Sequence, residues 1–255
     1  MVIFNVFEFR FAMFAGKPWA VNGAIKIWRK ELARSIKDPA LQEVLTPAYR
    51  IGCKRVLSSN EWYPALARDN VTVVPSGMSS VSYKTLTAED GTEVDADVVI
   101  WGTGFHVTDT IASLDVQGQN GLPLDEAWKD GLQAHLGTAV AGFPNLFFLL
   151  GPNTGLGHNS VVLMIEAQVD HICNLLDTMQ SQSLNAVVPA PEKQATFVEE
   201  IHDRLSDSVW QAGGCTSWYQ DENGRNTTLW PGTVREFQRL MASSGIEQYQ
   251  VVETE

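Results

Sequence analysis

The sequence predicts an α/β fold, because apolar runs of strand-forming residues lead directly into glycine-bearing turns and helical repeats. In the stretch 146–172, the five apolar residues LFFLL precede a turn-rich loop, and apolar residues then recur at helical spacing over 161–172. A second apolar run, 97–105, reaches Gly102 and Gly104 at its end. Glycine lets the backbone turn through positive φ or approach a ligand closely. A strand, a glycine turn and a helix start in this order predict a cofactor site.

The predicted helix start near residue 160 is the first candidate for ligand contact. Asn159 or Ser160 is expected to cap this helix. Unpaired N–H groups at a helix start attract phosphate and other groups that carry negative charge. The dinucleotide pattern G-x-G-x-x-G is only partly matched, at 102–107 and at 155–160, and both matches lack the third glycine. The chain therefore contains no complete phosphate-binding fingerprint.

Composition indicates a globular chain of one large domain or two small ones. Of 255 residues, 44% are hydrophobic and 19% are charged, which is enough apolar material for a core. The net charge of -12 argues against a general nucleic-acid or anionic-membrane surface. Three cysteines without a C-x-x-C pair favour a reducing compartment, so a cytoplasmic location is expected. The apolar N-terminus, interrupted by Glu8 and Arg10, is expected to form a core helix or strand and no membrane span.

Helical periodicity predicts three further helices. The segment 20–37 has apolar residues on one side, Asp38-Pro39 restarts a helix that ends before Thr46, and 191–210 is amphipathic with proline in its first turn. Short strands are expected at 71–74 and 81–87, followed by a turn at 89–92.

A set of motifs in fixed order resembles a known family. The motifs are GCKRVL (52–57), EWYPAL (61–66), DNVTVV (69–74), DVVIWGTGF (97–105), FPNLFFLLGPNTGLGHNS (143–160), IEAQ (165–168) and CTSWYQDENGRNTTLWPG (215–232). Together they resemble the C-terminal half of class B flavoprotein monooxygenases, especially Baeyer-Villiger monooxygenases of the hydroxyacetophenone type. The family usually reads A-T-G-F where Gly102 stands here. Its two N-terminal G-x-G-x-x-G motifs, and the His- and Trp-containing fingerprint between them, do not occur before residue 50.

The resemblance implies a partial flavoprotein with two dinucleotide-binding domains. Residues 1–94 would be the end of an NADPH-binding domain, and residues 95–255 the C-terminal segment of a FAD-binding domain. Such enzymes use FAD and NADPH, form a C4a-peroxyflavin with dioxygen, and transfer one oxygen atom to a small organic substrate, here by Baeyer-Villiger oxidation of ketones. N- or S-oxygenation and a non-catalytic truncated remnant are the alternatives.

The resemblance also assigns roles to a basic pair. Arg55 takes the position of the catalytic arginine, because a developing negative charge requires a cation that does not titrate away. Lys54 takes a position that contacts the 2′-phosphate of NADPH. A solvated surface pair is the alternative for both residues.

The remaining implied residues contact the cofactors. They are Gly102, Thr103, Gly104, Asn159 and Ser160 for the flavin, Trp218 for the nicotinamide nucleotide, and Gly151 as a further cofactor-binding residue. His158 is expected to have a structural role, core packing is the alternative for Trp218, and no metal site is predicted. In this family an N-terminal βαβ unit holds the ADP half of FAD, so the present chain is expected to bind FAD weakly or not at all. The strands 97–101 and 146–150 would lack partners, so self-association through unpaired edges is also expected.

Overall fold

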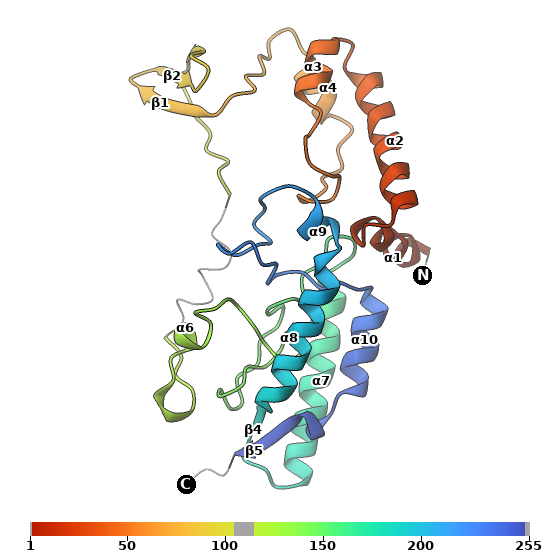
Figure 1. Cartoon of the computed structure of the whole chain (residues 1–255), viewed down its shortest axis with the longest axis vertical. Coiled ribbons are helices and arrows are strands. Elements are labelled where there is room, and N and C mark those ends of the chain that lie inside the picture. Colours follow the sequence, from red (N-terminus) through yellow and green to blue (C-terminus); the bar gives the residue numbers. More distant parts are fainter. Residues whose placement is uncertain (1, 105–114, 253–255) are drawn as a thin grey trace. The chain divides into compact units, whose positions relative to one another are not determined.

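The computed structural model describes residues 2–104 and 115–252, and the chain divides into two compact units (Figure 1). The larger unit comprises Met1–Ala24, Tyr49–Val56 and His106–Glu255. The smaller unit comprises Ile25–Ala48 and Leu57–Phe105. The chain therefore passes from the larger unit to the smaller one and back twice.

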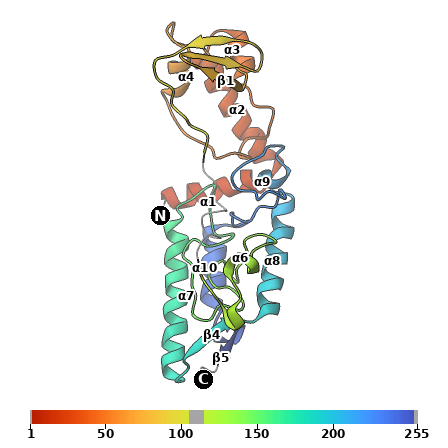
Figure 2. The ribbon, with the colours of Figure 1, turned by 90° about the vertical axis from the view of Figure 1, so that its left-hand side faces the viewer.

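Helices dominate the larger unit. Its elements are α1 (Val2–Phe14), the start of α2 (Pro18–Ser35), η1 (Gln119–Gly121), α6 (Leu124–Ala127), α7 (Val162–Ser181), α8 (Pro191–Ser206), α9 (Val209–Ala212), α10 (Val234–Ser243) and η2 (Ile246–Gln248), with strands β4 (Ala186–Pro189) and β5 (Tyr249–Val252). The long helices α7, α8 and α10 lie alongside one another, and β4 and β5 lie at one end of them (Figures 1 and 2). β4 and β5 pair antiparallel, from Ala186 opposite Val252 to Pro189 opposite Tyr249.

Periodic apolar residues on these helices form the main core. On α8, Phe197, Ile201 and Leu205 recur every fourth residue and are all buried. The stacked rings of Phe14 and Trp210, with centroids 5.1 Å apart, connect α1 to α9 in the same core. Burying one such large side chain contributes about 1.5–3 kcal/mol. The core therefore ties the first helix of the chain to its C-terminal third.

The smaller unit combines a short antiparallel sheet with helices. The sheet has the order β1 (Met78–Ser82), β2 (Thr85–Ala88) and β3 (Glu93–Asp95), and the helices are the rest of α2, α3 (Pro39–Val44) and α4 (Trp62–Leu66). Asp38 caps α3 by accepting a hydrogen bond from the Ala40 amide at 3.0 Å. Trp28 Nε1 donates to the Tyr63 hydroxyl at 2.7 Å and joins α2 to α4.

Most expected helices are confirmed, but several expected strands are wrong. Residues 71–74 and 97–101 form no strand, and 146–150 contributes only one isolated bridge, between Phe147 and Ala139. The expected strand 81–87 is broken by a turn at Tyr83, whose φ is 55°. Strand-forming composition produces a strand only where a neighbouring strand pairs with it, and the described chain supplies none for these segments. Phe105 of the second glycine stretch lies outside the described residues.

Two of the three cysteines are joined, contrary to the expectation drawn from a reducing compartment. Cys53 and Cys215 form a disulfide within the larger unit, and Cys173 is free and exposed on α7. Over the described ranges, no helix combines the length and apolar character needed to cross a membrane.

Candidate cofactor-facing site

The loop that carries the basic pair is held at a buried glycine-cysteine step. Gly52 has a φ of +92°, and a Cβ atom there would lie 3.2 Å from Val209 and 3.3 Å from Phe14. The positive φ therefore favours glycine, and a Cβ atom would in addition make tight contacts with two core side chains. Gly52 and Cys53 are buried, whereas Lys54 and the following residue are exposed. The backbone is thus anchored in the core directly before the two cations.

A second loop, 213–219, lies against the first. The Arg50 amide donates to the Gly213 carbonyl at 2.9 Å, and the disulfide from Cys53 enters the loop at Cys215. A Cβ atom on Gly213 would lie 2.7 Å from the Cys53 sulfur, so this close approach also requires glycine. The two loops are therefore packed together as well as covalently joined.

Aromatic residues and the predicted arginine meet beside this link. The rings of Trp218 and Tyr219 lie 4.3 Å apart between centroids, with Trp218 43% exposed and Tyr219 buried. Burial raises the pKa of the Tyr219 hydroxyl, and the positive charge of Arg55 partly opposes this shift. Lys54 Nζ lies 5.2 Å from the centroid of the Tyr49 ring. The structure thus brings three predicted site residues, Lys54, Arg55 and Trp218, onto two adjoining loops.

The start of α7 differs in detail from the expectation. The residue at the N-cap is Val161, which follows the two predicted residues Asn159 and Ser160, although the Ser160 hydroxyl accepts from the Val162 amide at 3.3 Å. Asn159 Oδ1 accepts from the Ser160 amide at 2.9 Å. The backbone amides of Ser160, which the sequence assigned to the flavin, and of Val162 therefore already donate hydrogen bonds to side chains of the loop.

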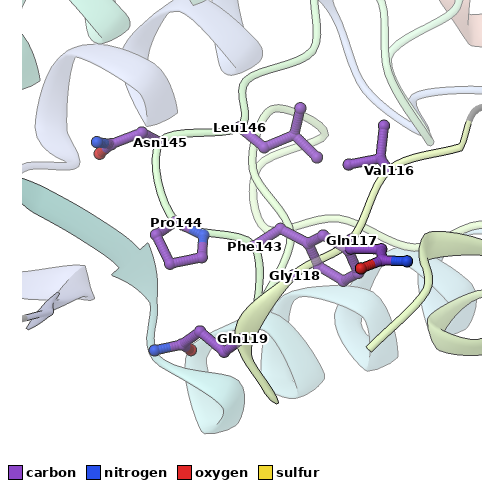
Figure 3. Close-up of a pocket in the computed structure, with 8 residues that line it drawn as sticks. All are labelled: Val116, Gln117, Gly118, Gln119, Phe143, Pro144, Asn145 and Leu146. Carbon is purple, nitrogen blue, oxygen red and sulfur yellow. The ribbon is translucent and has the colours of Figure 1, made fainter. Parts of the chain in front are cut away.

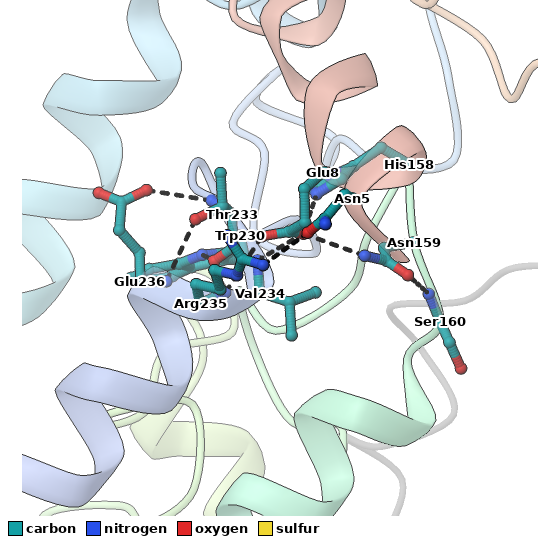
Figure 4. Close-up of polar contacts among 10 residues, drawn as sticks. All are labelled: Asn5, Glu8, His158, Asn159, Ser160, Trp230, Thr233, Val234, Arg235 and Glu236. Atoms are coloured by element: carbon teal, nitrogen blue, oxygen red, sulfur yellow. Dashed lines mark hydrogen bonds and ion pairs between the residues drawn. The ribbon is translucent and has the colours of Figure 1, made fainter. Parts of the chain in front are cut away.

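A carboxylate from α1, to which the sequence analysis assigns no functional role, organises this region (Figure 4). Glu8 accepts hydrogen bonds from Asn159 Nδ2 at 3.0 Å, from the Val234 amide at 3.1 Å and from the Arg235 amide at 3.3 Å. The last two amides are at the start of α10, where a negative charge is favourable. The signal in the sequence was the acidic residue that interrupts an otherwise apolar and aromatic helix.

His158 is placed as a structural residue. Its buried ring lies with Nε2 3.5 Å from Glu8 Oε1, and it packs against Phe11 at 5.3 Å between centroids. Burial lowers the pKa of His158, and the nearby Glu8 carboxylate opposes that shift. These contacts agree with the structural role expected from the sequence.

Glu8→Ala is expected to lower the free energy of unfolding by about 2–3 kcal/mol, because it removes a largely buried acceptor of charge-assisted hydrogen bonds. The Glu8 side chain is only 10% exposed. Urea denaturation followed by tryptophan fluorescence measures the change. Glu126→Ala is the matched control, since it removes an exposed carboxylate paired with Lys129 in the same unit. Equal stability of both variants would contradict this role of Glu8.

Gly151 lies where two backbone segments touch. A Cβ atom there would overlap the Gly137 carbonyl oxygen. The buried Gln168 side chain joins the same segments, since Oε1 accepts from the Leu150 amide at 2.9 Å and Nε2 donates to the Gly137 carbonyl at 3.0 Å. Packing alone accounts for glycine at 151 and for the buried amide at 168. The cofactor role of Gly151 stays a prediction.

The glycine stretch 102–104 belongs to the smaller unit, whereas α7 belongs to the larger one. Gly102, Thr103 and Gly104 are exposed, and a Cβ atom on either glycine would meet no other atom within 4 Å. Gly104 has a φ of +90°. The flavin role of these residues also stays a prediction.

An open pocket of about 410 Å³ lies elsewhere in the larger unit (Figure 3). Its lining residues come from two segments, 116–119 and 143–146, and include no charged side chain. Asn145 is already engaged, because its side chain donates to the Asn185 carbonyl and accepts from the Val187 amide. None of the predicted site residues lines this pocket.

Comparison with known proteins relates the chain to one enzyme class. No family model matches it. A Baeyer-Villiger monooxygenase of Streptomyces coelicolor is 44% identical over 98% of this chain and 49% of its own length. A Baeyer-Villiger monooxygenase of Pseudomonas aeruginosa is 39% identical over 99% of this chain and 48% of its own length.

Solved structures give the same relationship. An oxidised steroid monooxygenase bound to NADP matches with a TM-score of 0.82 and 25% identity, covering 95% of this chain and 47% of that one. Cyclohexanone monooxygenase from Rhodococcus sp. Phi1 bound to NADP+ matches in fold, with a TM-score of 0.81 and 23% identity over 95% and 47% of the two chains. The chain spans about half the length of the relatives that it matches. The resemblance drawn from the sequence motifs is confirmed.

Proposed function

We propose that this chain, related over its length to about half of a Baeyer-Villiger monooxygenase, supplies part of the site of a FAD- and NADPH-dependent monooxygenase that oxidises ketones. The observation that supports this most directly is the arrangement of Lys54, Arg55 and Trp218 on two joined loops. Under this proposal, residues 1–94 complete an NADPH-binding domain and residues 95–255 are the C-terminal part of a FAD-binding domain. A small organic substrate and dioxygen are the other reactants, and the protein acts in the cytoplasm.

Arg55 has the properties that oxygen insertion next to a carbonyl requires. Arginine supplies a planar cation with several N–H donors, which suits an oxyanion better than the flexible ammonium group of lysine. Arg55 is exposed, and no carboxylate forms an ion pair with it in the part of the chain that the structure describes. An unneutralised cation of this kind stabilises negative charge that develops on reacting oxygen atoms. The reduced flavin, when bound, supplies the oxygen-activating chemistry.

Lys54 and Trp218 fit a dinucleotide phosphate. The exposed ammonium group of Lys54 is a compact charge that suits the 2′-phosphate of NADPH. Trp218 leaves 43% of its surface exposed, which provides a flat face for a ribose or nicotinamide ring. Both residues are therefore available to a ligand and need no rearrangement of an existing ion pair.

The fit of FAD to the α7 start is less direct. Asn159 binds Glu8, and the Ser160 and Val162 amides bind neighbouring side chains. Contact of Asn159 and Ser160 with the flavin would require these hydrogen bonds to be shared or exchanged. Gly102, Thr103 and Gly104, which are exposed, are the more accessible flavin-binding residues of this chain.

An apolar stripe on α7 supports a need for further protein surface. Val162, Val169 and Leu176 follow one another at intervals of seven residues and are 55%, 39% and 49% exposed. Leu149 and Leu150, in the preceding loop, are 49% and 39% exposed. Exposed apolar side chains that recur along one helix face mediate association. This stripe favours either self-association or cover by the remaining half of a monooxygenase.

The test of the function uses a hybrid in which this chain replaces the matching half of the Streptomyces coelicolor relative. Incubation with NADPH, dioxygen and matched ketone, amine and sulfide substrates, followed by mass spectrometry, separates the outcomes. Ester formation from the ketone is the expected result. Oxidation of only the amine or the sulfide would show N- or S-oxygenation in place of Baeyer-Villiger chemistry. The absence of any oxygenated product would favour a non-catalytic remnant.

Lys54→Ala in this hybrid is expected to raise the KM for NADPH about tenfold and to leave kcat near the parent value, because it removes a contact to the 2′-phosphate. The KM for NADH should stay unchanged, since NADH carries no such phosphate. Steady-state NADPH and NADH oxidation give both constants. Lys129→Ala, an exposed lysine paired with Glu126, is the control. An unchanged ratio of the two KM values would contradict the assignment.

A further inference from the structure

The disulfide between Cys53 and Cys215 lies within the predicted site. Cys53 directly precedes Lys54 and Arg55, and Cys215 precedes Trp218 by three residues. The two cysteines are 162 positions apart in the chain, and their Cα atoms are 6.1 Å apart. The covalent link therefore joins the two loops that carry the proposed nucleotide contacts.

Neither loop is held by regular secondary structure. Residues 49–56 contain no helix or strand, and residues 213–219 follow the end of α9 at Ala212. The Arg50 to Gly213 backbone hydrogen bond is a weak restraint beside a covalent bond. The disulfide therefore adds a covalent restraint to this hydrogen bond and to the packing of Gly52 against Val209.

The two cations depend on this backbone anchor. Within residues 2–104 and 115–252, no carboxylate forms an ion pair with Lys54 or Arg55. Lys54 lies over the Tyr49 ring of its own loop, which does not fix that loop against the second one. Because neither side chain makes an ion pair, the direction in which Lys54 and Arg55 project depends on the backbone, which is anchored at the buried Cys53.

We propose that the Cys53–Cys215 disulfide is a positioning element of the nicotinamide-nucleotide site, and that thiol-disulfide exchange at this bond controls the affinity for NADP(H). The proposal rests on the proposed function of Lys54 and Trp218. In the disulfide form Lys54 and Trp218 are held on two joined loops, so binding of NADP(H) costs little conformational entropy for ordering these loops. In the dithiol form this covalent restraint is lost, the two loops become more mobile, and the affinity for NADP(H) falls.

The exchange chemistry requires a dithiol reductant in one direction and a disulfide oxidant in the other. A reductant thiolate attacks the sulfur of Cys215, which is half-buried, whereas Cys53 is fully buried. The sulfur-sulfur bond breaks and Cys53 leaves as a thiolate that takes up a proton. The second thiolate of the reductant then attacks the reductant sulfur that is bonded to Cys215. This closes the disulfide of the reductant and releases Cys215 as a thiolate, which takes up a proton. The protein gains two electrons and two protons, and the reductant becomes a disulfide.

The test compares the parent chain with Cys53→Ser, Cys215→Ser and Cys173→Ser. Cys173 is exposed and free on α7, so its variant is the matched control. Alkylation of the denatured chain followed by mass spectrometry counts free thiols before and after treatment with a dithiol. Hydrogen exchange reports the mobility of 49–56 and 213–219. Calorimetric titration of the hybrid enzyme, carrying the same cysteine variants, with NADP+ measures affinity.

One free thiol is expected in the untreated parent and three after reduction. Reduction should speed exchange in both loops and weaken NADP+ binding about tenfold in the parent and in Cys173→Ser, while far-UV circular dichroism stays unchanged. Cys53→Ser and Cys215→Ser should resemble the reduced parent with or without reductant. If a serine variant does not fold, the parent before and after treatment with the dithiol provides the comparison between the disulfide and dithiol forms.

Three results would overturn the proposal. These are three free thiols without reductant, loop exchange or NADP+ affinity that does not respond to reduction, and loss of the circular dichroism signal on reduction, which would identify a general stabilising link. Absence of NADP+ binding in every form, together with redox-dependent exchange in the two loops, would instead contradict the proposed function and support the positioning role of the disulfide.

Discussion

Replacing Arg55 with alanine is expected to reduce oxygen insertion by about 100-fold or more in the hybrid enzyme, since one group that stabilises transition-state charge typically contributes that much. Flavin reduction by NADPH should continue, because Arg55 acts after that step in the proposed role. NADPH would then be consumed without a matching amount of ester. Stopped-flow absorbance at the flavin band measures reduction, and chromatography of the product measures insertion.

The control is Arg50→Ala, which removes an arginine from the same loop five positions earlier. The structure assigns the Arg50 backbone amide, and not its guanidinium, a contact with Gly213. Arg55→Lys tests the need for the planar cation, and partial activity is expected because the charge is kept. Parent rates of ester formation in Arg55→Ala would show that Arg55 is only a surface charge.

The 255-residue chain by itself is expected to retain no FAD after gel filtration and to oxidise no NADPH. The relatives that it matches are about twice as long. Two amides at the α7 start are already bonded to side chains, and Val162, Val169 and Leu176 leave an apolar stripe exposed. Self-association through that stripe is expected to bring the chain out of the column ahead of a monomer.

The measurement is flavin absorbance and light scattering across the gel-filtration peak, followed by an NADPH consumption assay. Leu176→Glu, which places a charge on the exposed stripe, should move the peak towards the monomer without restoring flavin. A yellow monomer that consumes NADPH would contradict the prediction, and would require another part of this chain to bind the FAD phosphates.

Helices were predictable from the sequence because their signals are local. The Asp38 cap, the proline at the start of α8 and the apolar repeat of α7 all act within a few residues. Strands at 97–101 and 146–150 were not predictable in the same way, because a strand requires hydrogen-bonding partners from elsewhere. Val98 and Ile100 are 76% and 90% exposed, although their composition is typical of a buried strand.

The residue types of the site were predictable from the sequence, but the disulfide and the hydrogen bonds that join distant segments of the chain were not. The order of motifs pointed to Lys54, Arg55 and Trp218, and the structure places them on adjoining loops. Three cysteines allow three pairings, and nothing local selects Cys53 with Cys215 across 162 positions. The contact of Glu8 with α10 spans even more of the chain, so tertiary packing alone reveals it.

Cross-linking Cys53 to Cys215 closes the intervening chain into a covalent ring, and the segment Leu57–Phe105 of the smaller unit lies on that ring. Hydrolysis of one peptide bond within the ring adds a water molecule but separates no fragments until a reductant is added. Hydrolysis outside the ring divides the chain at once into two pieces that are no longer covalently joined. Removing Leu57–Phe105 therefore requires two cuts, and a protein nicked once between the cysteines remains a single covalent molecule.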